Sequence, residues 1–212
     1  MKKRSLIVAI ALVLAICLGV AAWSSSAKSG PEVDALAVLL DWRPGQTVAE
    51  IGAGKGSMTI SAAQRVGPTG RVFSTELNPE RLAGIQTAAS KLHLANVTTI
   101  QGGESSTNLP RACCDSIFMR FVYHHFTHPV EIDASLLGAL KPGGRLAVID
   151  FRPTRILSVL RPVNGVPSNR GGHGIPKQVL IDELTGAGFA LAATPPDWPG
   201  PGYCVVFRKP AP

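Results

Sequence analysis

The sequence predicts a doubly wound α/β fold, which is an open and mostly parallel sheet with helices on both faces. Short apolar runs typical of buried strands alternate with segments of helical length, as in consecutive strand–helix–strand units. A glycine-rich stretch at residues 52–56 leads from one such run straight into a helical segment. The last two predicted strands have no helix between them, so we expect them to pair as an antiparallel hairpin.

The first half of the chain supplies five of the predicted elements. Asn78 and Pro79 mark one helix start, because an Asn side chain accepts hydrogen bonds from free N–H groups and proline has the φ of a first helical turn. A Gly-Pro-Thr-Gly turn at 67–70 separates one helix from the strand after it. In order, the expected elements are a helix over 31–40, a strand over 47–51, a helix over 57–66, a strand over 71–75 and a helix over 79–91.

The second half continues the alternation and ends in the hairpin. A Lys-Pro-Gly-Gly sequence at 141–144 ends a helix and turns the chain into a strand. Residues 152–175 are expected to form one long irregular stretch. The expected elements are strands over 97–100 and 116–119, a helix over 130–140, a strand over 145–151, a helix over 176–187, and strands over 189–193 and 203–208.

The composition limits the class of protein. The chain has 212 residues, of which 45% are hydrophobic and 17% charged, which suits one folded domain and excludes a disordered chain. Four cysteines are too few for a disulfide framework, and the adjacent Cys113 and Cys114 lack the spacing of a metal site, so no metal is expected. Three of the 21 basic residues lie in the first four positions, and the remaining mild basicity does not indicate nucleic-acid binding.

Residues 1–27 are predicted to be a signal peptide or an N-terminal membrane anchor, and residues 28–212 the folded domain. A Lys-Lys-Arg cluster precedes a long apolar run, and small residues follow it. The run would cross a membrane through residues 5–23, and its length leaves both cleavage and anchoring open. The positive-inside rule then predicts a domain that is membrane-anchored or exported on the extracytoplasmic (periplasmic) side, with attachment at the cytoplasmic face as the alternative.

The glycine stretch is the strongest local indication of a ligand. Gly52, Gly54 and Gly56 let the backbone turn sharply beside a ligand, and the helix start offers free N–H groups. Lys55 is followed by glycine rather than Ser or Thr, which excludes a phosphate-binding P-loop. Ser57 stands where a dinucleotide-binding loop has its third glycine, so the spacing departs from that motif as well.

Two acids flank this stretch. Glu50 ends the strand before it, where a carboxylate disfavours a pyrophosphate and suits a ligand with an ammonium group, which favours S-adenosylmethionine over NAD. Glu76 ends the next strand and can accept hydrogen bonds from both hydroxyls of an adenosine ribose, as it could for NAD. The alternative for both acids is a solvated strand end without a ligand.

An ordered set of segments extends across the domain: VAEIGAGKG (48–56), STELNP (74–79), DSIFMRFVYHHF (115–126), LKPGGRLAVIDF (140–151) and AGF (187–189). With these segments the chain resembles the class I S-adenosylmethionine-dependent methyltransferases over about residues 31–209. Among them it is similar to small bacterial enzymes of the ubiquinone/menaquinone methyltransferase type. The resemblance implies a Rossmann-like, seven-stranded, three-layer αβα domain whose C-terminal strand is antiparallel.

The resemblance also implies roles for single residues. Glu76 would hold the ribose hydroxyls, Leu77 would lie against the adenine, and Arg120 would face the methionine and the substrate. Glycine occupies the family's usual acidic position near the adenine, and Glu104 would substitute for that acid. The residues that would line the methionine and ribose end are Glu50, Gly52, Ala53, Gly54 and Gly56.

Methyl transfer from a sulfonium needs mainly proximity and orientation, and a base only where the acceptor loses a proton. The candidate catalytic residues are Tyr123, His124 and His125, because they follow the fourth predicted strand, where substrate meets cofactor in an open α/β sheet. The alternative is that they only support this loop. Residues 152–181 carry bases and no acid, and they form either a lid over an anionic or lipid-headgroup acceptor or a solvated, mobile loop.

The predicted function is therefore methyl transfer from S-adenosylmethionine to a small or lipophilic acceptor. One alternative is an NAD(P)-dependent oxidoreductase. The other is a non-catalytic nucleoside-binding module of the same fold, because the predicted leader places the domain where S-adenosylmethionine is not made.

Overall fold

The computed structural model describes residues 30–211, so the predicted leader at 1–27 lies outside the described residues. None of the helices between residues 30 and 211 combines the length and the apolar composition that a bilayer crossing requires.

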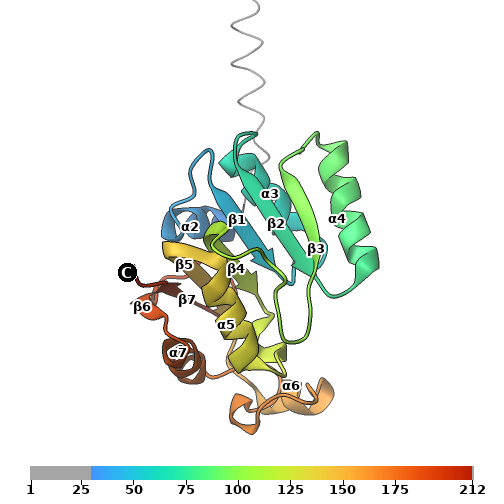
Figure 1. Ribbon diagram of the computed structural model, residues 1–212. Helices are drawn as coiled ribbons and strands as arrows, with labels where there is room; N and C mark the ends of the chain where they lie inside the picture. The colour runs from blue at the N-terminus through green and yellow to red at the C-terminus, as the bar shows by residue number, and fades with distance from the viewer. Residues whose placement is uncertain (1–29, 212) are drawn as a thin grey trace, which may run out of the picture.

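Seven strands form one sheet in the order β3-β2-β1-β4-β5-β7-β6 (Figure 1). Strands β1 to β5 pair in parallel, whereas β7 is antiparallel to both of its neighbours. The predicted fold class is confirmed, including the closing hairpin and the antiparallel last strand. The strands are β1 (Thr47–Ile51), β2 (Arg71–Glu76), β3 (Val97–Gln101), β4 (Cys114–Arg120), β5 (Leu140–Asp150), β6 (Ala190–Ala193) and β7 (Tyr203–Arg208).

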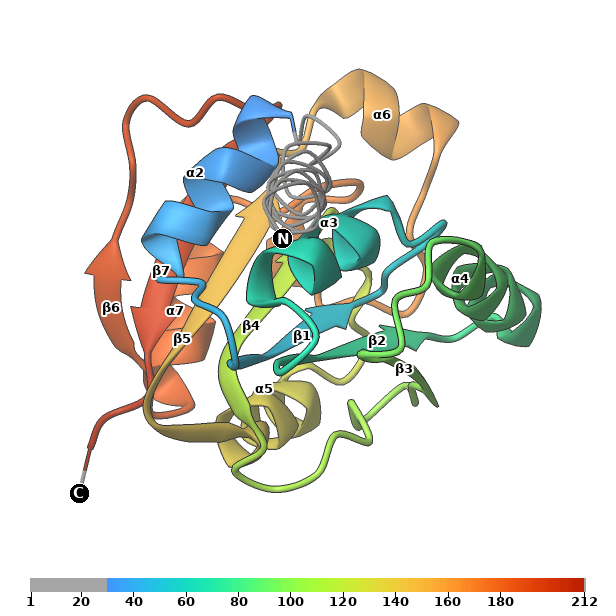
Figure 2. The same ribbon diagram turned by 90° about the horizontal axis from the view of Figure 1, so that it is seen from above.

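Helices cover both faces of the sheet, with α3 and α5 on opposite sides of the strands (Figure 2). One face packs against α2, α3 and α4, and the other packs against α5 and α7. Beyond the carboxyl ends of the strands lies α6 (Figure 1). The helices are α2 (Pro31–Leu39), α3 (Ser57–Val66), α4 (Pro79–Lys91), α5 (Pro129–Ala139), α6 (Arg155–Leu160) and α7 (Lys177–Gly186), with short 3₁₀ turns η1 (Tyr123–His125) and η2 (Ser168–Arg170).

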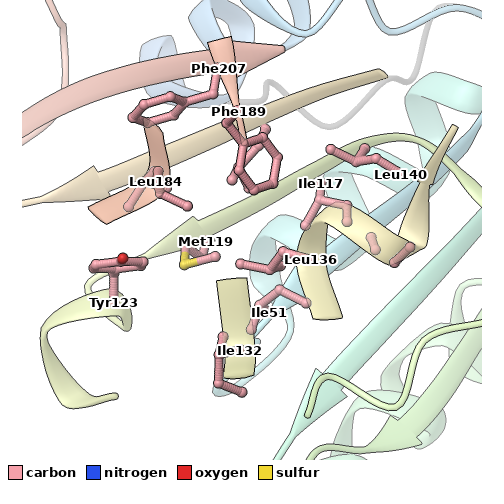
Figure 3. Close-up of a cluster of buried hydrophobic side chains, with 14 of the residues drawn as sticks. Ile51, Ile117, Met119, Tyr123, Ile132, Leu136, Leu140, Leu184, Phe189 and Phe207 are labelled. Carbon is pink, nitrogen blue, oxygen red and sulfur yellow. The ribbon is translucent and has the colours of Figure 1, made fainter. Parts of the chain in front are cut away.

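The central strands are buried on both faces, as parallel strands between two helical layers must be. Residues 146–149 of β5 are all apolar and fully buried for this reason. Figure 3 shows the apolar cluster on the face of α5 and α7, where Leu136 of α5 and Leu184 of α7 lie with Ile117 and Met119 of β4. Burial of these side chains holds the strands in register, so their carboxyl ends meet at one edge of the sheet.

Two predictions about the second half of the chain are wrong in part. The fifth strand begins at Leu140 rather than at residue 145, because Leu140 pairs with Cys114 and the register shifts between Cys114 and Ser116. The helix before it accordingly ends at Ala139. The stretch 152–175 is not irregular throughout, since it contains α6 and η2.

Candidate active site

A cavity of about 400 Å³ opens at the carboxyl edge of the sheet. Its wall consists of the ends of β1, β2 and β4 with the residues that follow them, the loop after β3, part of the segment 121–127, and one side chain each of α4 and α5. Its volume falls in the range of roughly 300–1,000 Å³ that small-molecule sites occupy. The site therefore lies where ligands bind in open α/β sheets.

The glycine loop forms the turn between β1 and α3, beside this cavity. Gly52, Gly54 and Gly56 have φ values of 66°, 57° and 77°, in the left-handed region that favours glycine. A Cβ atom on Gly52 would lie 2.5 Å from Val122, whereas one on Gly54 would meet no heavy atom within 4 Å. A Cβ atom on Gly56 would lie 2.7 Å from Ile85 of α4. The first and third glycines thus allow close packing, and the second faces open space.

Glu76 connects this loop to the end of β2. Its Oε2 accepts a hydrogen bond from the Gly54 N–H at 2.8 Å, and its Oε1 accepts one from the Leu77 N–H at 3.0 Å. The Arg81 guanidinium lies 3.6 Å from Oε2. The side chain is buried yet lines the cavity, so Glu76 is in place to accept hydrogen bonds from a ligand as well.

Glu50 lies on the opposite side of the loop and does not line the cavity. It is 4% exposed, and the Thr59 hydroxyl donates a hydrogen bond to its Oε2. The Thr59 and Ser74 hydroxyl oxygens lie 2.8 Å apart. Glu50, Thr59 and Ser74 thus form one buried group of hydrogen-bonded side chains. Burial raises the pKa of Glu50 to about 8, so the carboxyl group is mostly neutral at pH 7. Its predicted contact with an ammonium group stays a prediction that this geometry does not favour.

The loop after β3 forms the far end of the cavity. Leu77, 57% exposed, and Glu104 both line it, and their contacts with an adenine stay a prediction. Gly102 and Gly103 lie between them and leave this part of the wall to backbone atoms. Thr107, which the sequence analysis missed, is buried and also lines the cavity, with its hydroxyl 2.8 Å from that of Ser135.

Arg120 and Phe121 form the opposite end of the cavity. The Arg120 Nε donates to Glu32 of α2 at 2.7 Å, and its guanidinium lies 4.1 Å from the centre of the Phe121 ring. Phe121 has a φ of 59°, an unfavourable value for a bulky residue that is found mainly at functional sites. Val122 and Phe126 continue this apolar wall.

Of the three candidate catalytic residues, His125 alone lines the cavity. Tyr123 is fully buried in the apolar cluster (Figure 3), and its hydroxyl lies 2.9 Å from Asp133 and 3.0 Å from Glu183. Burial raises the pKa of Tyr123 well above its usual range, so it stays a neutral phenol. His124 is 1% exposed and pairs with Asp150. The structure thus gives Tyr123 and His124 no direct contact with the cavity.

The basicity of His125 depends on its surroundings. Partial burial lowers the pKa of His125 to about 4, helped by the nearby imidazoles of His124 and His173, because a positive charge on either would repel a proton on His125. The imidazole is therefore neutral at pH 7, and one of its nitrogens is free to accept a hydrogen bond from a ligand.

Residues 152–175 are held to the domain by buried side chains, of which Arg170 is the polar one and Ile175 belongs to the apolar cluster. Arg170 is fully buried, donates to the Tyr123 carbonyl at 3.0 Å and pairs with Glu183 at 2.9 Å. Its guanidinium also lies 4.7 Å from the centre of the Tyr123 ring. An entirely solvated loop is therefore wrong for this stretch, while the exposed Arg152 and Arg161 remain compatible with a lid.

The described residues fit S-adenosylmethionine. Glu76 provides carboxylate oxygens for the ribose, Gly54 leaves open space beside the loop, and Leu77 offers an apolar surface for an adenine. No group of three or more His, Cys, Asp or Glu side chains between residues 30 and 211 is arranged to hold a metal ion.

Residues 43–170 match a family model described as "Methyltransferase domain". The chain is 34% identical over 110 residues to the ubiquinone/menaquinone biosynthesis C-methyltransferase UbiE of Ectopseudomonas mendocina, covering 51% of this chain and 43% of that protein. It is 33% identical over 117 residues to the UbiE of Stutzerimonas stutzeri, covering 54% and 46%. The chain thus spans less than half the length of these curated relatives.

Solved structures share the fold. The chain matches a SAM-dependent methyltransferase from Aquifex aeolicus with a TM-score of 0.66 and 23% identity, covering 83% of this chain and 87% of that one. It matches a SAM-dependent O-methyltransferase from Thermotoga maritima with a TM-score of 0.60 and 20% identity, covering 87% and 67%.

Proposed function

The chain belongs to the methyltransferase domain family, and from this premise we propose that it transfers a methyl group from S-adenosylmethionine to a small, lipophilic acceptor. The resemblance to class I S-adenosylmethionine-dependent methyltransferases that the sequence predicts is confirmed, and S-adenosylmethionine is the cofactor. No observation favours the oxidoreductase alternative.

One observation supports the proposal that the acceptor is lipophilic, namely the extent and lining of the cavity. A single cavity extends from Glu76 and the glycine loop to His125, so a cofactor held at one end would present its reactive group toward the other. The acceptor end is lined by Phe121, Val122 and Phe126, which favour an apolar or aromatic ligand. The UbiE proteins are named for the biosynthesis of quinones, and a lipophilic ring compound is consistent with this lining.

Bound S-adenosylmethionine would supply an activated methyl group on a sulfonium. The chain's own residues then provide orientation, which is the main requirement of an in-line displacement. Arg120, braced by Glu32, and the ring of Phe121 would position the acceptor. His125 is the residue at this end that can take a proton, because it is neutral at pH 7 and lines the cavity.

The test combines binding and transfer, measured on the full chain. Calorimetry with S-adenosylhomocysteine and with NAD compares the two cofactors, and we expect binding of the first only. Methyl-labelled S-adenosylmethionine is then offered with a panel of phenols, quinols and thiols, and transfer to a lipophilic member is expected. Binding of NAD alone would contradict the cofactor, and binding without any transfer would favour the non-catalytic module.

Two histidine variants test whether His125 acts as the general base. We expect His125→Gln to lower the transfer rate to acceptors that must lose a proton by roughly 100-fold, the lower end of general-base contributions. His128→Gln is the matched control, because His128 is exposed and its side chain bonds only to Thr127 among the hydrogen bonds of the described residues. Equal rates for the two variants would argue against His125.

We also propose that residues 1–27 export or anchor the domain. The support is the Lys-Lys-Arg cluster followed by the apolar run through residues 5–23. A topology reporter fused after Pro212 and the measured mass of the mature chain separate the outcomes. Reporter activity on the cytoplasmic side would contradict export, and an unchanged mass would favour the anchor.

A further inference from the structure

Three imidazoles from separate positions in the chain meet behind the acceptor end of the cavity. His124 and His125 belong to η1, and His173 lies in the loop between η2 and α7. The ring of His124 lies with its centre 4.0 Å from that of His125 and 4.9 Å from that of His173. The rings of His125 and His173 lie 5.8 Å apart. We call these three residues the histidine cluster.

Asp150, at the end of β5, fixes the orientation of His124. The Asp150 carboxylate is fully buried, and its Oδ1 lies 2.8 Å from Nδ1 of His124. Its Oδ2 accepts from the His124 N–H at 3.1 Å, and its Oδ1 accepts from the Phe151 N–H at 2.8 Å. The hydrogen bond to the Asp150 carboxyl oxygen favours the tautomer of His124 with a proton on Nδ1, which leaves the lone pair on Nε2.

This lone pair has no partner within the described part of the chain. Nε2 of His124 is buried without a hydrogen bond, and so is Nδ1 of His173. An unpaired buried polar atom destabilises the folded state, and native structures keep few of them without a function. These atoms are therefore available to receive a proton or a hydrogen bond when a ligand occupies the cavity.

The histidine cluster adjoins the cavity through two of its wall residues. His125 is both a member of the cluster and part of the wall. Phe121, also in the wall, lies 5.4 Å from Phe151, whose ring lies 4.9 Å from that of His124. The His124 ring thus lies directly behind His125, a residue of the cavity wall.

We propose that His124 and Asp150 form a relay pair behind His125 that receives the proton lost by a phenolic acceptor during methyl transfer. The proposal rests on the proposed function, and it narrows the acceptor to an aromatic hydroxyl. Asp150 is the positioning residue, because it acts only through the orientation and tautomer of His124. His173 completes the cluster, with its ring centre 4.9 Å from that of His124.

The proposed reaction is a displacement at the methyl carbon that is accompanied by transfer of one proton. A lone pair of the acceptor oxygen forms the new bond to the methyl carbon, and the bond from carbon to the sulfonium sulfur breaks with its electron pair on sulfur. The acceptor's O–H proton passes to His125. It then passes to Nε2 of His124 once the two rings, which share no hydrogen bond in this structure, turn their nitrogens toward each other. The Asp150 carboxylate stabilises the resulting imidazolium, and the proton returns to solvent when product leaves.

Binding of 4-nitrophenol to the full chain saturated with S-adenosylhomocysteine tests the relay without turnover, because the phenolate absorbs in the visible. We expect the wild type to bind the probe and raise its ionised fraction above that in buffer at the same pH. Asp150→Asn and His124→Gln should abolish this increase, while His128→Gln should retain it. We also expect both variants to lower kcat for a methylated phenol by roughly 100-fold with little change in KM.

Nitrogen-15 spectra of the histidine side chains separate a relay from a structural role. The proton of His124 should reside on Nδ1 in the wild type and on Nε2 in Asp150→Asn, because the Asn amide would donate to Nδ1.

His173→Asn, at a partly buried position, provides a variant with a smaller risk of unfolding and should reduce the ionised fraction of the probe. Failure of the wild type to bind S-adenosylhomocysteine would contradict the proposed function. Cofactor binding without increased ionisation of the probe, or variants that match His128→Gln, would overturn the relay.

Discussion

The two ends of the cavity are built differently. The cofactor end consists of the glycine loop and the strand end at Glu76, and its contacts join residues at most a few dozen positions apart, such as Gly54 and Glu76. The acceptor end depends on side chains from distant segments, such as Tyr123 with Arg170, 47 positions apart. The shape of the cofactor end depends mainly on backbone geometry, whereas the shape of the acceptor end depends mainly on contacts between buried polar side chains. The two ends should therefore respond separately to substitution.

The largest effect is expected at Glu50, beneath the cofactor end. Burial raises its pKa from 4.5 to about 8, so the folded state keeps a proton that the unfolded state loses in this pH window. The free energy of unfolding thus falls as pH rises from 4.5 to 8, by about 1.4 kcal/mol per unit. Glu50→Gln keeps an acceptor for Thr59 and loses no proton. We expect it to be more stable than the wild type by on the order of 4 kcal/mol at pH 8.

Urea unfolding of the wild type and Glu50→Gln between pH 4.5 and 8 measures this effect. The difference in unfolding free energy should approach zero at the acidic end, where both side chains are neutral. A difference that stays constant across the range would show that Glu50 is ionised in the folded state.

The next largest change in the free energy of unfolding is expected at Arg170, near the acceptor end. We expect Arg170→Leu to lower the free energy of unfolding by about 3 kcal/mol, because it leaves Glu183 without its cationic partner and removes the contacts of Arg170 to Tyr123. Arg161→Leu is the matched control, since Arg161 is exposed in the same stretch. Calorimetry of S-adenosylhomocysteine below the melting temperature of both variants should show unchanged affinity. Loss of this affinity would mean that the two ends are coupled.

This difference explains what the sequence could and could not predict. The glycine loop was predictable because its positive φ values favour glycine, and the position of Glu76 followed from the end of a predicted strand. The sequence also placed Glu50 at a strand end, but neighbouring strand residues face opposite sides, and Glu50 faces away from the cavity that Ile51 lines.

The acceptor end was less predictable because its contacts span long separations. Asp150 and His173 appeared only as a strand end and as part of an irregular stretch, and tertiary packing alone brings them to His124. Tyr123 and His125 are two positions apart in η1, yet one is buried and the other lines the cavity. A motif of adjacent polar residues indicates a site without showing which side chain faces it.

A smaller effect is expected for Glu76→Gln. The amide keeps one acceptor oxygen but places an NH₂ group near the Gly54 or Leu77 N–H, so the loop and a ribose would each lose a hydrogen bond. We expect the affinity for S-adenosylhomocysteine to fall about tenfold, equivalent to about 1.4 kcal/mol. Glu80→Gln, at an exposed position in the first turn of α4, is the control. Binding of 4-nitrophenol should be unchanged in both variants.

The smallest effect tests how far the cofactor end depends on the start of α4. The Asn78 side chain accepts hydrogen bonds from the Glu80 N–H at 2.8 Å and the Arg81 N–H at 3.2 Å, so Asn78→Ala leaves both donors unpaired. We expect it to lower the free energy of unfolding by about 1 kcal/mol, whereas Asn78→Asp, which keeps the acceptor, should not. Because Glu76 and Leu77 directly precede this cap, S-adenosylhomocysteine should bind slightly more weakly to Asn78→Ala. A weaker response to 4-nitrophenol at the acceptor end would contradict the separation of the two ends.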